Sequence, residues 1–481
     1  MTEGSTDGGD PSAVGSRAAT TGNRRRVLVV CGDTLSRQMA GPGIRAWHMA
    51  LLLAQESDVR LVSTSSCDRP GEGFRTFQAT WEELREHVEW AEVAVVQGYL
   101  LTAVPWLVES DVVLVCDLYD PLHLEQLEQA KDEPPDEYRR IVAGAVNTLN
   151  DQVVRGDFFL AASERQRDLW LGQLGAAGRL NPDNYEQDRS LRRLIDVVPF
   201  GLPAEPPRRT GPGVRGVVPG IGADDRIIIW AGGVYNWFDP ETVVRAVDLL
   251  RRDVPTVRLY FMGMTHPNPD VPRMRTATRT RELSDRLGLT GSHVFFNAGW
   301  VDYDERQNYL LDADIGVTTH FDHLETTFSF RTRVLDYLWA GLPVVSTVGD
   351  HFGSLVEQRG LGAAVRENDV EGLRAALERL LTDPGAAAAA REAVGVVREE
   401  YAWPRALAPL LAFCRDPRPA PDRAAGAVAV RPAGMVAPPR RWTLAGDVRT
   451  LQLYIRQGGV REVVRRTAGR LRRLLHGDPP K

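Results

Sequence analysis

The chain has 481 residues, 43% of them hydrophobic and 25% charged, which is typical of a soluble protein with about two to three domains. Its net charge of -6 argues against a general nucleic-acid binder, because such proteins carry a basic surface that neutralises phosphates. The four cysteines lack metal-ligand spacing, which indicates buried or incidental thiols, and no run approaches the ~18 apolar residues that span a bilayer.

The first half of the chain alternates between strand-like and helical patterns. Residues 1–23 are polar and glycine-rich, which predicts a disordered leader and not a signal peptide. Short apolar runs then alternate with helical segments such as 44–54, and this is the rhythm of a parallel sheet covered on both faces. We predict an N-terminal Rossmann-like domain over residues 24–200. Its expected strands are 26–30, 59–64, 93–96, 112–115, 158–161 and 195–198.

A Pro- and Gly-rich segment, residues 201–224, predicts a linker to a second domain of the same kind over 225–414. Its expected strands are 227–230, 257–261, 294–296, 315–318 and 344–347. Its helices are expected to begin near Pro240, Thr276, Tyr303, Phe330 and His351. Further helices are expected over 370–382 and 386–400. The fold class is therefore α/β, with two doubly wound domains that face each other across one cleft.

The C-terminal end has a different composition. Residues 415–440 are rich in Pro, Ala and Arg and predict a second linker. From Arg440 onward there are eleven Lys or Arg and three Asp or Glu, and apolar residues recur at helical spacing. We therefore interpret residues 441–481 as a basic amphipathic helical tail. Two interpretations stay open: the tail lies on an anionic membrane, or it packs on the acidic surface of the protein itself.

In each domain, one glycine-containing loop follows the first strand. In CGDTLSRQMAGPGIRAWHM, glycines precede a helix whose N–H groups are suited to an anion, although a tight strand-to-helix turn would need the same residues. The loop WAGGVYNWFDPETVV also permits close approach, and an exposed tryptophan there would contact a sugar or the other domain. The candidate donor-binding residues of the two loops are Gly41, Gly43, Arg45, Gly232, Gly233, Asn236 and Trp237.

The segment THFDHLETTFSFRTRVLDYLWAGLPVVST is the most informative. Arg331 and Arg333 are expected in the first turn of a helix that begins near Phe330, where cations oppose the helix dipole. A bound diphosphate would resolve this conflict, so both are candidate catalytic residues, with Ser329 and Asp336 as donor-binding neighbours. The alternative is that the arginines pair with acidic neighbours.

Acidic residues gather after a strand of the first domain, in VCDLYDPLHLEQLE. Carboxylates at the carboxyl end of a strand can accept hydrogen bonds from sugar hydroxyls or help to deprotonate an acceptor. Asp120 and His123 are the candidate catalytic residues here. Helix capping is the alternative for Asp120, because Pro121 follows it.

The helix after Phe328 resembles the donor-binding region of the family-4-like (group 1) retaining glycosyltransferases of the GT-B fold. That family has a Glu-x7-Glu motif followed by Ala-x-x-Gly-x-Pro-Val. Asp336 stands at the second glutamate and Phe328 at the first. The loop Ala40–Arg45 resembles the family's N-terminal glycine loop. The Arg and Lys that usually follow the first strand of the second domain are not evident in AGGVYNWFD. A frequent family histidine is replaced near Asp120. The resemblance covers about residues 25–415, and the run SFRTRVLDYLWAGLP resembles a bacterial surface-glycan or secondary-metabolite subgroup.

The resemblance implies transfer of a sugar, with retention, from a nucleotide-sugar donor to a glycan, lipid-linked or small-molecule acceptor. It implies no cofactor and no metal. The net charge predicts no nucleic-acid partner, and the cysteines and the lack of a signal peptide or membrane span predict a cytoplasmic location, which includes the inner face of the membrane if the tail binds there. Two alternatives are a nucleotide-sugar epimerase of the same architecture and a degenerate partner subunit that binds a sugar nucleotide without turnover. A dehydrogenase is disfavoured, because neither domain has the G-x-G-x-x-G fingerprint.

Overall fold

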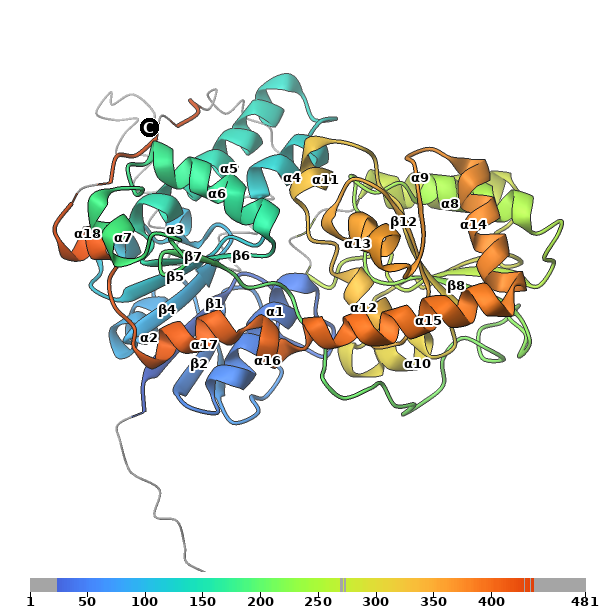
Figure 1. The fold of residues 1–481 in the computed structure, drawn as a ribbon, viewed down its shortest axis with the longest axis horizontal. Helices are drawn as coiled ribbons and strands as arrows, with labels where there is room; N and C mark the ends of the chain where they lie inside the picture. Colours follow the sequence, from blue (N-terminus) through green and yellow to red (C-terminus); the bar gives the residue numbers. More distant parts are fainter. Residues whose placement is uncertain (1–23, 269–270, 272–273, 428, 433, 437–481) are drawn as a thin grey trace, which may run out of the picture.

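The protein folds into two α/β domains that lie side by side (Figure 1). The computed structural model describes residues 24–436, apart from 269, 270, 272, 273, 428 and 433. The expected leader 1–23 and tail 441–481 lie outside the described residues. Within them the prediction of two doubly wound parallel sheets is confirmed.

The N-terminal domain has a seven-stranded parallel sheet in the order β3-β2-β1-β4-β5-β6-β7. Its strands are β1 (Arg26–Cys31), β2 (Asp58–Ser63), β3 (Arg75–Gln78), β4 (Val93–Gln97), β5 (Val113–Asp117), β6 (Phe158–Ala161) and β7 (Ile195–Val197). Its helices are α1 (Gly41–Leu53), α2 (Leu84–Trp90), α3 (Leu100–Ala103), α4 (Leu122–Gln129), α5 (Pro135–Arg155), α6 (Glu164–Ala176) and α7 (Pro182–Gln187).

The C-terminal domain has a six-stranded parallel sheet in the order β10-β9-β8-β11-β12-β13. Its strands are β8 (Arg226–Trp230), β9 (Val257–Phe261), β10 (Val294–Phe296), β11 (Ile315–Thr318), β12 (Val344–Thr347) and β13 (Gly362–Val365). Its helices are α8 (Pro240–Leu250), α9 (Arg275–Arg286), α10 (Arg306–Leu310), α11 (Leu324–Phe328), α12 (Arg333–Trp339), α13 (His351–Arg359), α14 (Val370–Thr382) and α15 (Pro384–Arg398).

The elements that sequence reasoning missed are short or lie at sheet edges. The strands β3 and β13 each have four residues and lie at sheet edges. β3 (RTFQ) lacks an apolar run, and β13 (GAAV) consists mainly of glycine and alanine, which have low strand propensity. The helix α11 has five residues, too few for a helical period to show. Its presence delays the next helix, so α12 begins at Arg333 and not near Phe330.

The chain crosses between the domains twice, and the two crossings pair with each other. Leu202 N donates to Tyr401 O at 2.8 Å, and Trp403 N donates to Leu202 O at 3.0 Å. Between them Gly201 is required, because a Cβ there would lie 2.6 Å from the Trp403 ring. These contacts join residues that lie some 200 positions apart in the sequence, so they hold the two crossings side by side between the domains.

Residues 403–424 return to the N-terminal domain, although the sequence assigned residues up to 414 to the second domain and 415–440 to a linker. The helices α16 (Trp403–Ala406) and α17 (Ala408–Arg415) continue the line of α15 back across both domains (Figure 1). Phe413 stacks on Phe158 at 4.5 Å, and α18 (Pro421–Ala424) is held by a buried ion pair between Asp422 and Arg179. Apolar packing and this ion pair outweigh the coil-forming composition of the segment.

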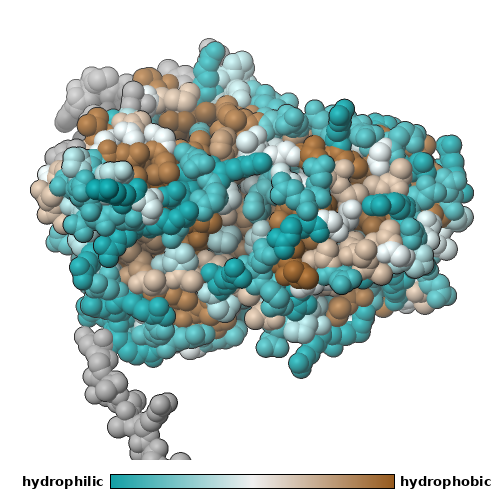
Figure 2. Space-filling model, in the orientation of Figure 1, coloured by the Kyte–Doolittle hydropathy of each residue, from teal (hydrophilic) through white to brown (hydrophobic). Residues whose placement is uncertain are grey.

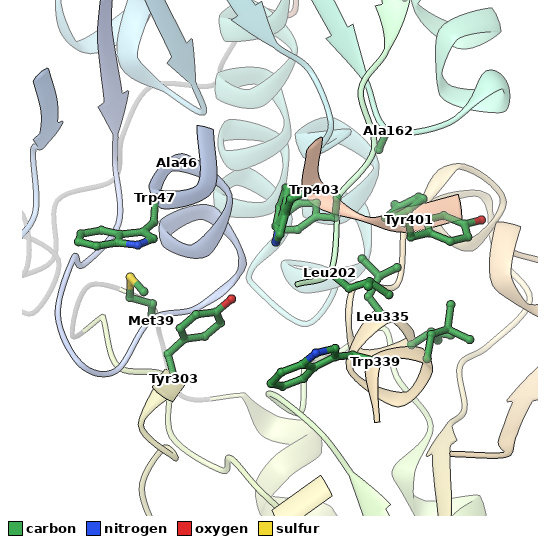
Figure 3. Close-up of a cluster of buried hydrophobic side chains, with 14 of the residues drawn as sticks. Met39, Ala46, Trp47, Ala162, Leu202, Tyr303, Leu335, Trp339, Tyr401 and Trp403 are labelled. Atoms are coloured by element: carbon green, nitrogen blue, oxygen red, sulfur yellow. The ribbon is translucent and has the colours of Figure 1, made fainter. Parts of the chain in front are cut away.

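One hydrophobic cluster runs continuously through both domains and both crossings. Side chains of the first domain, such as Met39 and Trp47, lie opposite Tyr303, Leu335 and Trp339 of the second (Figure 3). Leu202, Tyr401 and Trp403 fill the space between them. Because these groups are buried against one another, the two domains are held in a closed arrangement.

Candidate functional site

A cleft that is open to solvent lies between the domains at the carboxyl ends of β1 and β8. This is where parallel α/β sheets bind ligands. Both domains and the first crossing contribute to its walls. The lining residues include Gly41, Ile44, Phe200, Gly232, Gly233, Tyr235, Trp300, Tyr303, Arg306, Arg333 and Asp336.

Backbone atoms of the two glycine loops line the cleft. Gly41 begins α1, and no side chain caps the first N–H groups of that helix, so they are available to an anion. Gly43 packs closely on the preceding loop, because a Cβ there would lie 2.8 Å from Thr34 O. In the second domain Gly232 has a φ of +78°, and a Cβ on Gly233 would lie 2.9 Å from the Tyr235 ring. Glycine is therefore needed at 43, 232 and 233 to build the cleft wall.

Arg45 is not a donor ligand, which corrects the sequence interpretation. Its side chain is fully buried, and its guanidinium binds both oxygens of Asp117, at 2.6 and 2.8 Å. It also donates to Val198 O at 2.8 Å and to Pro199 O at 3.0 Å. Each of its three nitrogens donates to a protein acceptor, so Arg45 positions the glycine loop, the end of β5 and the first crossing relative to one another.

Arg331 has a structural partner as well, as the alternative interpretation allowed. Its guanidinium forms a bidentate pair with Glu325, with N–O distances of 2.8 and 2.6 Å, and both side chains are buried. It lies two residues before α12 begins, so it is outside the first helical turn. The prediction of two phosphate-binding arginines is therefore wrong for Arg331.

Arg333 has the geometry that a phosphate ligand needs. It is the first residue of α12 and lines the cleft, and its side chain packs over the rings of Phe238 and Trp230 at 4.0 and 4.4 Å. Its Nη2 donates to Gly233 O at 2.7 Å, while Nη1 has no hydrogen-bond partner among the described residues. Burial lowers the pKa of Arg333 to about 10, so the guanidinium is still charged at neutral pH. A buried charge with an unused donor is costly unless an anion binds it.

Asp336 lines the cleft one turn further along α12. Arg306 Nε donates to it at 3.0 Å, and the Arg306 guanidinium lies 3.8 Å from the Tyr303 ring centre and 4.4 Å from that of Trp339. The Asp336 side chain stays about one-third exposed. It therefore keeps acceptor capacity toward the cleft, and it is held in place by an arginine that the sequence pattern did not single out.

Three predicted donor-binding residues lie away from the cleft wall. Trp237 is buried, against the expectation of an exposed ring, and stacks on Tyr235 at 4.9 Å. Asn236 joins the domains, because its Nδ2 donates to Gln129 O at 3.3 Å. The Ser329 hydroxyl donates to Thr326 O at 3.0 Å. These residues support the site through packing, the interface and a turn.

The acidic loop after β5 lies at the domain interface. Gln166 Nε2 donates both to Tyr119 O and to Phe328 O, at 2.7 and 2.8 Å, which brings this loop against the segment before α12. Asp120 is half-buried, and burial raises its pKa to about 6. His123 lies on α4 against Trp170, and burial lowers its pKa to about 4, so the ring is neutral at pH 7. Asp120 does not cap α4, since its side chain interacts with Glu125.

Some cleft residues escaped the sequence reasoning because their signal is not local. Tyr303 and Arg306 belong to a short 3-10 turn and the helix after it. The Tyr303 hydroxyl lies 2.8 Å from Nε2 of His48 in the other domain, and Trp300 Nε1 donates to Met39 O at 3.1 Å. Only the tertiary arrangement shows that this segment closes the cleft. Within the described residues, no three His, Cys, Asp or Glu side chains are placed to hold a metal ion.

Comparison with known proteins agrees with this geometry. Residues 225–383 match the family model described as "Glycosyl transferases group 1". No curated protein matches this chain in sequence.

Solved structures with the same fold cover both domains. Sucrose-phosphate synthase from Thermosynechococcus elongatus has a TM-score of 0.57 at 15% identity, over 82% of this chain and 98% of that one. Anabaena HepE in complex with UDP-glucose has a TM-score of 0.58 at 14% identity, over 80% and 98%. An E. coli trehalose-6-phosphate structure bound with UDP-2-fluoro glucose has a TM-score of 0.54 at 12% identity, over 82% and 100%.

The two arginines near α12 make different predictions. Arg333→Met should weaken nucleotide binding about tenfold or more, since it removes a charge-assisted hydrogen bond, and should leave the melting temperature nearly unchanged. Arg331→Met should instead destabilise the fold by roughly 3–5 kcal/mol, because it leaves the Glu325 carboxylate buried without its partner. Calorimetric titration and thermal unfolding of both variants would separate these roles. Equal loss of nucleotide affinity in two stably folded variants would contradict the assignment.

Proposed function

We propose that this group 1 glycosyltransferase of the GT-B fold binds a nucleoside-diphosphate sugar in the cleft between its domains and transfers the sugar to an acceptor hydroxyl. The observation that carries this proposal is Arg333, which lines a cleft with two glycine loops and a helix start, and whose buried Nη1 has no hydrogen-bond partner among the described residues. Backbone N–H groups and a guanidinium in one cleft are suited to a diphosphate.

The proposed donor lies along the second domain. Its diphosphate contacts the Gly232–Gly233 backbone and Arg333, and its ribose lies toward Asp336 and Arg306. As the bond to the anomeric carbon breaks, negative charge develops on the leaving phosphate. Arg333 and the N–H dipoles stabilise that charge, and their fixed positions mean that little reorganisation is needed during the reaction. The acceptor oxygen bonds to the anomeric carbon, and its proton leaves with the departing diphosphate.

Retention and the choice of nucleotide are part of the proposal. Retention is what the resemblance to the group 1 family implies. Two structures with the same fold are described as complexes with UDP-glucose and UDP-2-fluoro glucose, which makes UDP-sugars the first donors to test. We also propose that no metal ion takes part, since an arginine and N–H groups supply the positive charge at the leaving group.

A nucleotide screen tests the donor assignment. Binding of the correct nucleotide sugar should raise the melting temperature. At a ligand concentration of 100 Kd, mass action increases the free energy of unfolding by about 2.7 kcal/mol. With UDP-glucose or GDP-mannose and an acceptor panel, nucleoside diphosphate should form, and EDTA should not change the rate. An isomerised nucleotide sugar in the absence of acceptor would instead show an epimerase. Binding without turnover across the panel would show a partner subunit.

The acceptor proposed first is lipid-linked. The basic amphipathic pattern of residues 440–481 is suited to an anionic membrane surface. The described chain ends beside the N-terminal domain, where Asn147 of α5 donates to Met435 O at 3.1 Å. Hydrophobic side chains gather over the upper part of this domain (Figure 2). No helix within the described residues has the length and apolar content to cross a membrane.

Vesicle sedimentation tests the membrane proposal. The full chain should sediment with vesicles that contain phosphatidylglycerol and lose this binding in high salt, because surface charge attraction is screened. Removal of residues 440–481 should abolish sedimentation and leave UDP-glucose affinity unchanged. Neutral phosphatidylcholine vesicles are the control. Equal sedimentation of the full and shortened chains would contradict the proposal.

A further inference from the structure

A segment of the second domain, residues 300–306, is hydrogen-bonded to the glycine loop of the first domain. Tyr303 N donates to Arg37 O at 2.8 Å, and Gln38 Nε2 donates to Trp300 O at 2.9 Å. Each of these hydrogen bonds joins atoms of different domains, so both break when the domains separate. The position of the segment in this structure therefore depends on the closed arrangement.

The side chain of Tyr303 extends further into the first domain. Its ring points from the second domain toward the first (Figure 3), and its hydroxyl lies 2.8 Å from Nε2 of His48. The His48 ring stacks on Trp403, in the second crossing, at 4.5 Å. Burial, together with the charges of Arg306 and Arg69, lowers the pKa of His48 to about 3, so the ring is neutral. Tyr303 is thus held by a neutral ring that both the first domain and the crossing keep in place.

Tyr303 in turn fixes the guanidinium of Arg306. The centre of the Tyr303 ring lies 3.8 Å from that guanidinium, and the Tyr303 carbonyl accepts from Arg306 Nη1 at 2.7 Å. The ring of Trp339 covers the same guanidinium at 4.4 Å, and Arg306 Nε donates to Asp336 at 3.0 Å. A buried charge is stable only with such partners, so Arg306 follows Tyr303 when that residue moves. Contacts therefore continue from the first domain through Tyr303 and Arg306 to Asp336.

The phosphate contacts proposed for the second domain do not have this dependence. Arg333 donates to the carbonyl of Gly233, and its guanidinium lies over Trp230 and Phe238. All four residues belong to the second domain. The contacts that hold Arg333 thus persist when the domains separate, whereas the support of Asp336 through Tyr303 does not.

We propose that Tyr303 is a positioning residue, which makes recognition of the donor ribose depend on closure of the two domains. In the closed arrangement His48 holds Tyr303, and Arg306 then holds Asp336 with its side chain partly exposed to the cleft for a ribose hydroxyl. In an open arrangement the diphosphate still binds, but the ribose contact weakens. By linkage, a bound ribose favours the closed arrangement by the same free energy. This inference rests on the proposed donor site.

The test compares UDP with 2′,3′-dideoxy-UDP, because the two nucleotides differ only in the ribose hydroxyls. By calorimetric titration, the wild-type protein should bind UDP about tenfold more tightly, which is the effect of a hydrogen bond to a charged group. Tyr303→Phe removes the hydroxyl and keeps the ring beside Arg306. It should lose most of this preference and keep the wild-type affinity for 2′,3′-dideoxy-UDP. Asp336→Ala should lose the preference completely.

A second variant and a matched control separate positioning from a general loss of stability. His48→Phe removes the same hydrogen bond from the other domain and keeps a ring that stacks on Trp403. Its preference should fall as much as that of Tyr303→Phe, and the double variant should lose no more than either single variant, because both changes remove one contact. Tyr309→Phe is the control, since Tyr309 lies on α10 and stacks on Tyr260 within the second domain. It should keep the wild-type preference.

The outcomes distinguish this inference from the proposed function. Tyr303→Phe that keeps the preference, or that binds both nucleotides equally more weakly, would overturn the inference and leave the proposed function standing. A wild-type protein that binds the two nucleotides equally would have the same meaning. Either single variant decides the test if the other does not fold, and GDP with 2′,3′-dideoxy-GDP serves for a protein that prefers GDP. A wild-type protein that binds none of UDP, UDP-glucose, GDP and GDP-mannose would overturn both.

Discussion

The guanidinium of Arg45 connects the parts of the molecule from which the site is built. It extends from the helix that begins at the glycine loop, binds both oxygens of Asp117 at the end of β5, and donates to the carbonyls of Val198 and Pro199 at the first crossing. Because the pair is buried, a shift of any one of these elements would leave a charge without its partner, which is costly in a low-dielectric interior. The glycine loop, the acidic loop and the first crossing between the domains are therefore fixed relative to one another.

The charged residues around α12 also differ in their contacts. Arg331 neutralises Glu325 and ties α11 to the loop that follows it. Among the described residues, Arg333 donates to the carbonyl of Gly233, and its Nη1 has no hydrogen-bond partner. The two arginines thus differ in their contacts: Arg331 has a carboxylate partner, and Arg333 lies over the rings of Trp230 and Phe238 at the cleft. Glu325 and Asp336 likewise differ: the first is buried in its ion pair, and the second is still partly open to the cleft.

The sequence predicted what repeats locally and missed what depends on tertiary contacts. A short stretch of sequence is enough to predict long apolar strands such as β1 and β8. The same holds for capped helices such as α8, whose N-cap is Asp239. The contact of Arg45 with Asp117 and that of Tyr303 with His48 join residues far apart in the sequence, which no local pattern records. The pairing of Arg331 with Glu325, six residues away, was one of the two interpretations that the sequence left open. The tryptophan expected to be exposed, Trp237, is buried because Tyr235 and Phe238 of its own loop cover it.

We propose that the cleft between the domains holds a nucleotide sugar with Arg333 as its phosphate ligand. A crystal structure of the protein with UDP bound would test this arrangement. We expect the diphosphate within hydrogen-bond distance of Arg333 Nη1 and of the Gly232–Gly233 backbone, with the ribose beside Asp336. A nucleotide bound elsewhere, or an Arg331 that has left Glu325 to reach the phosphates, would contradict it.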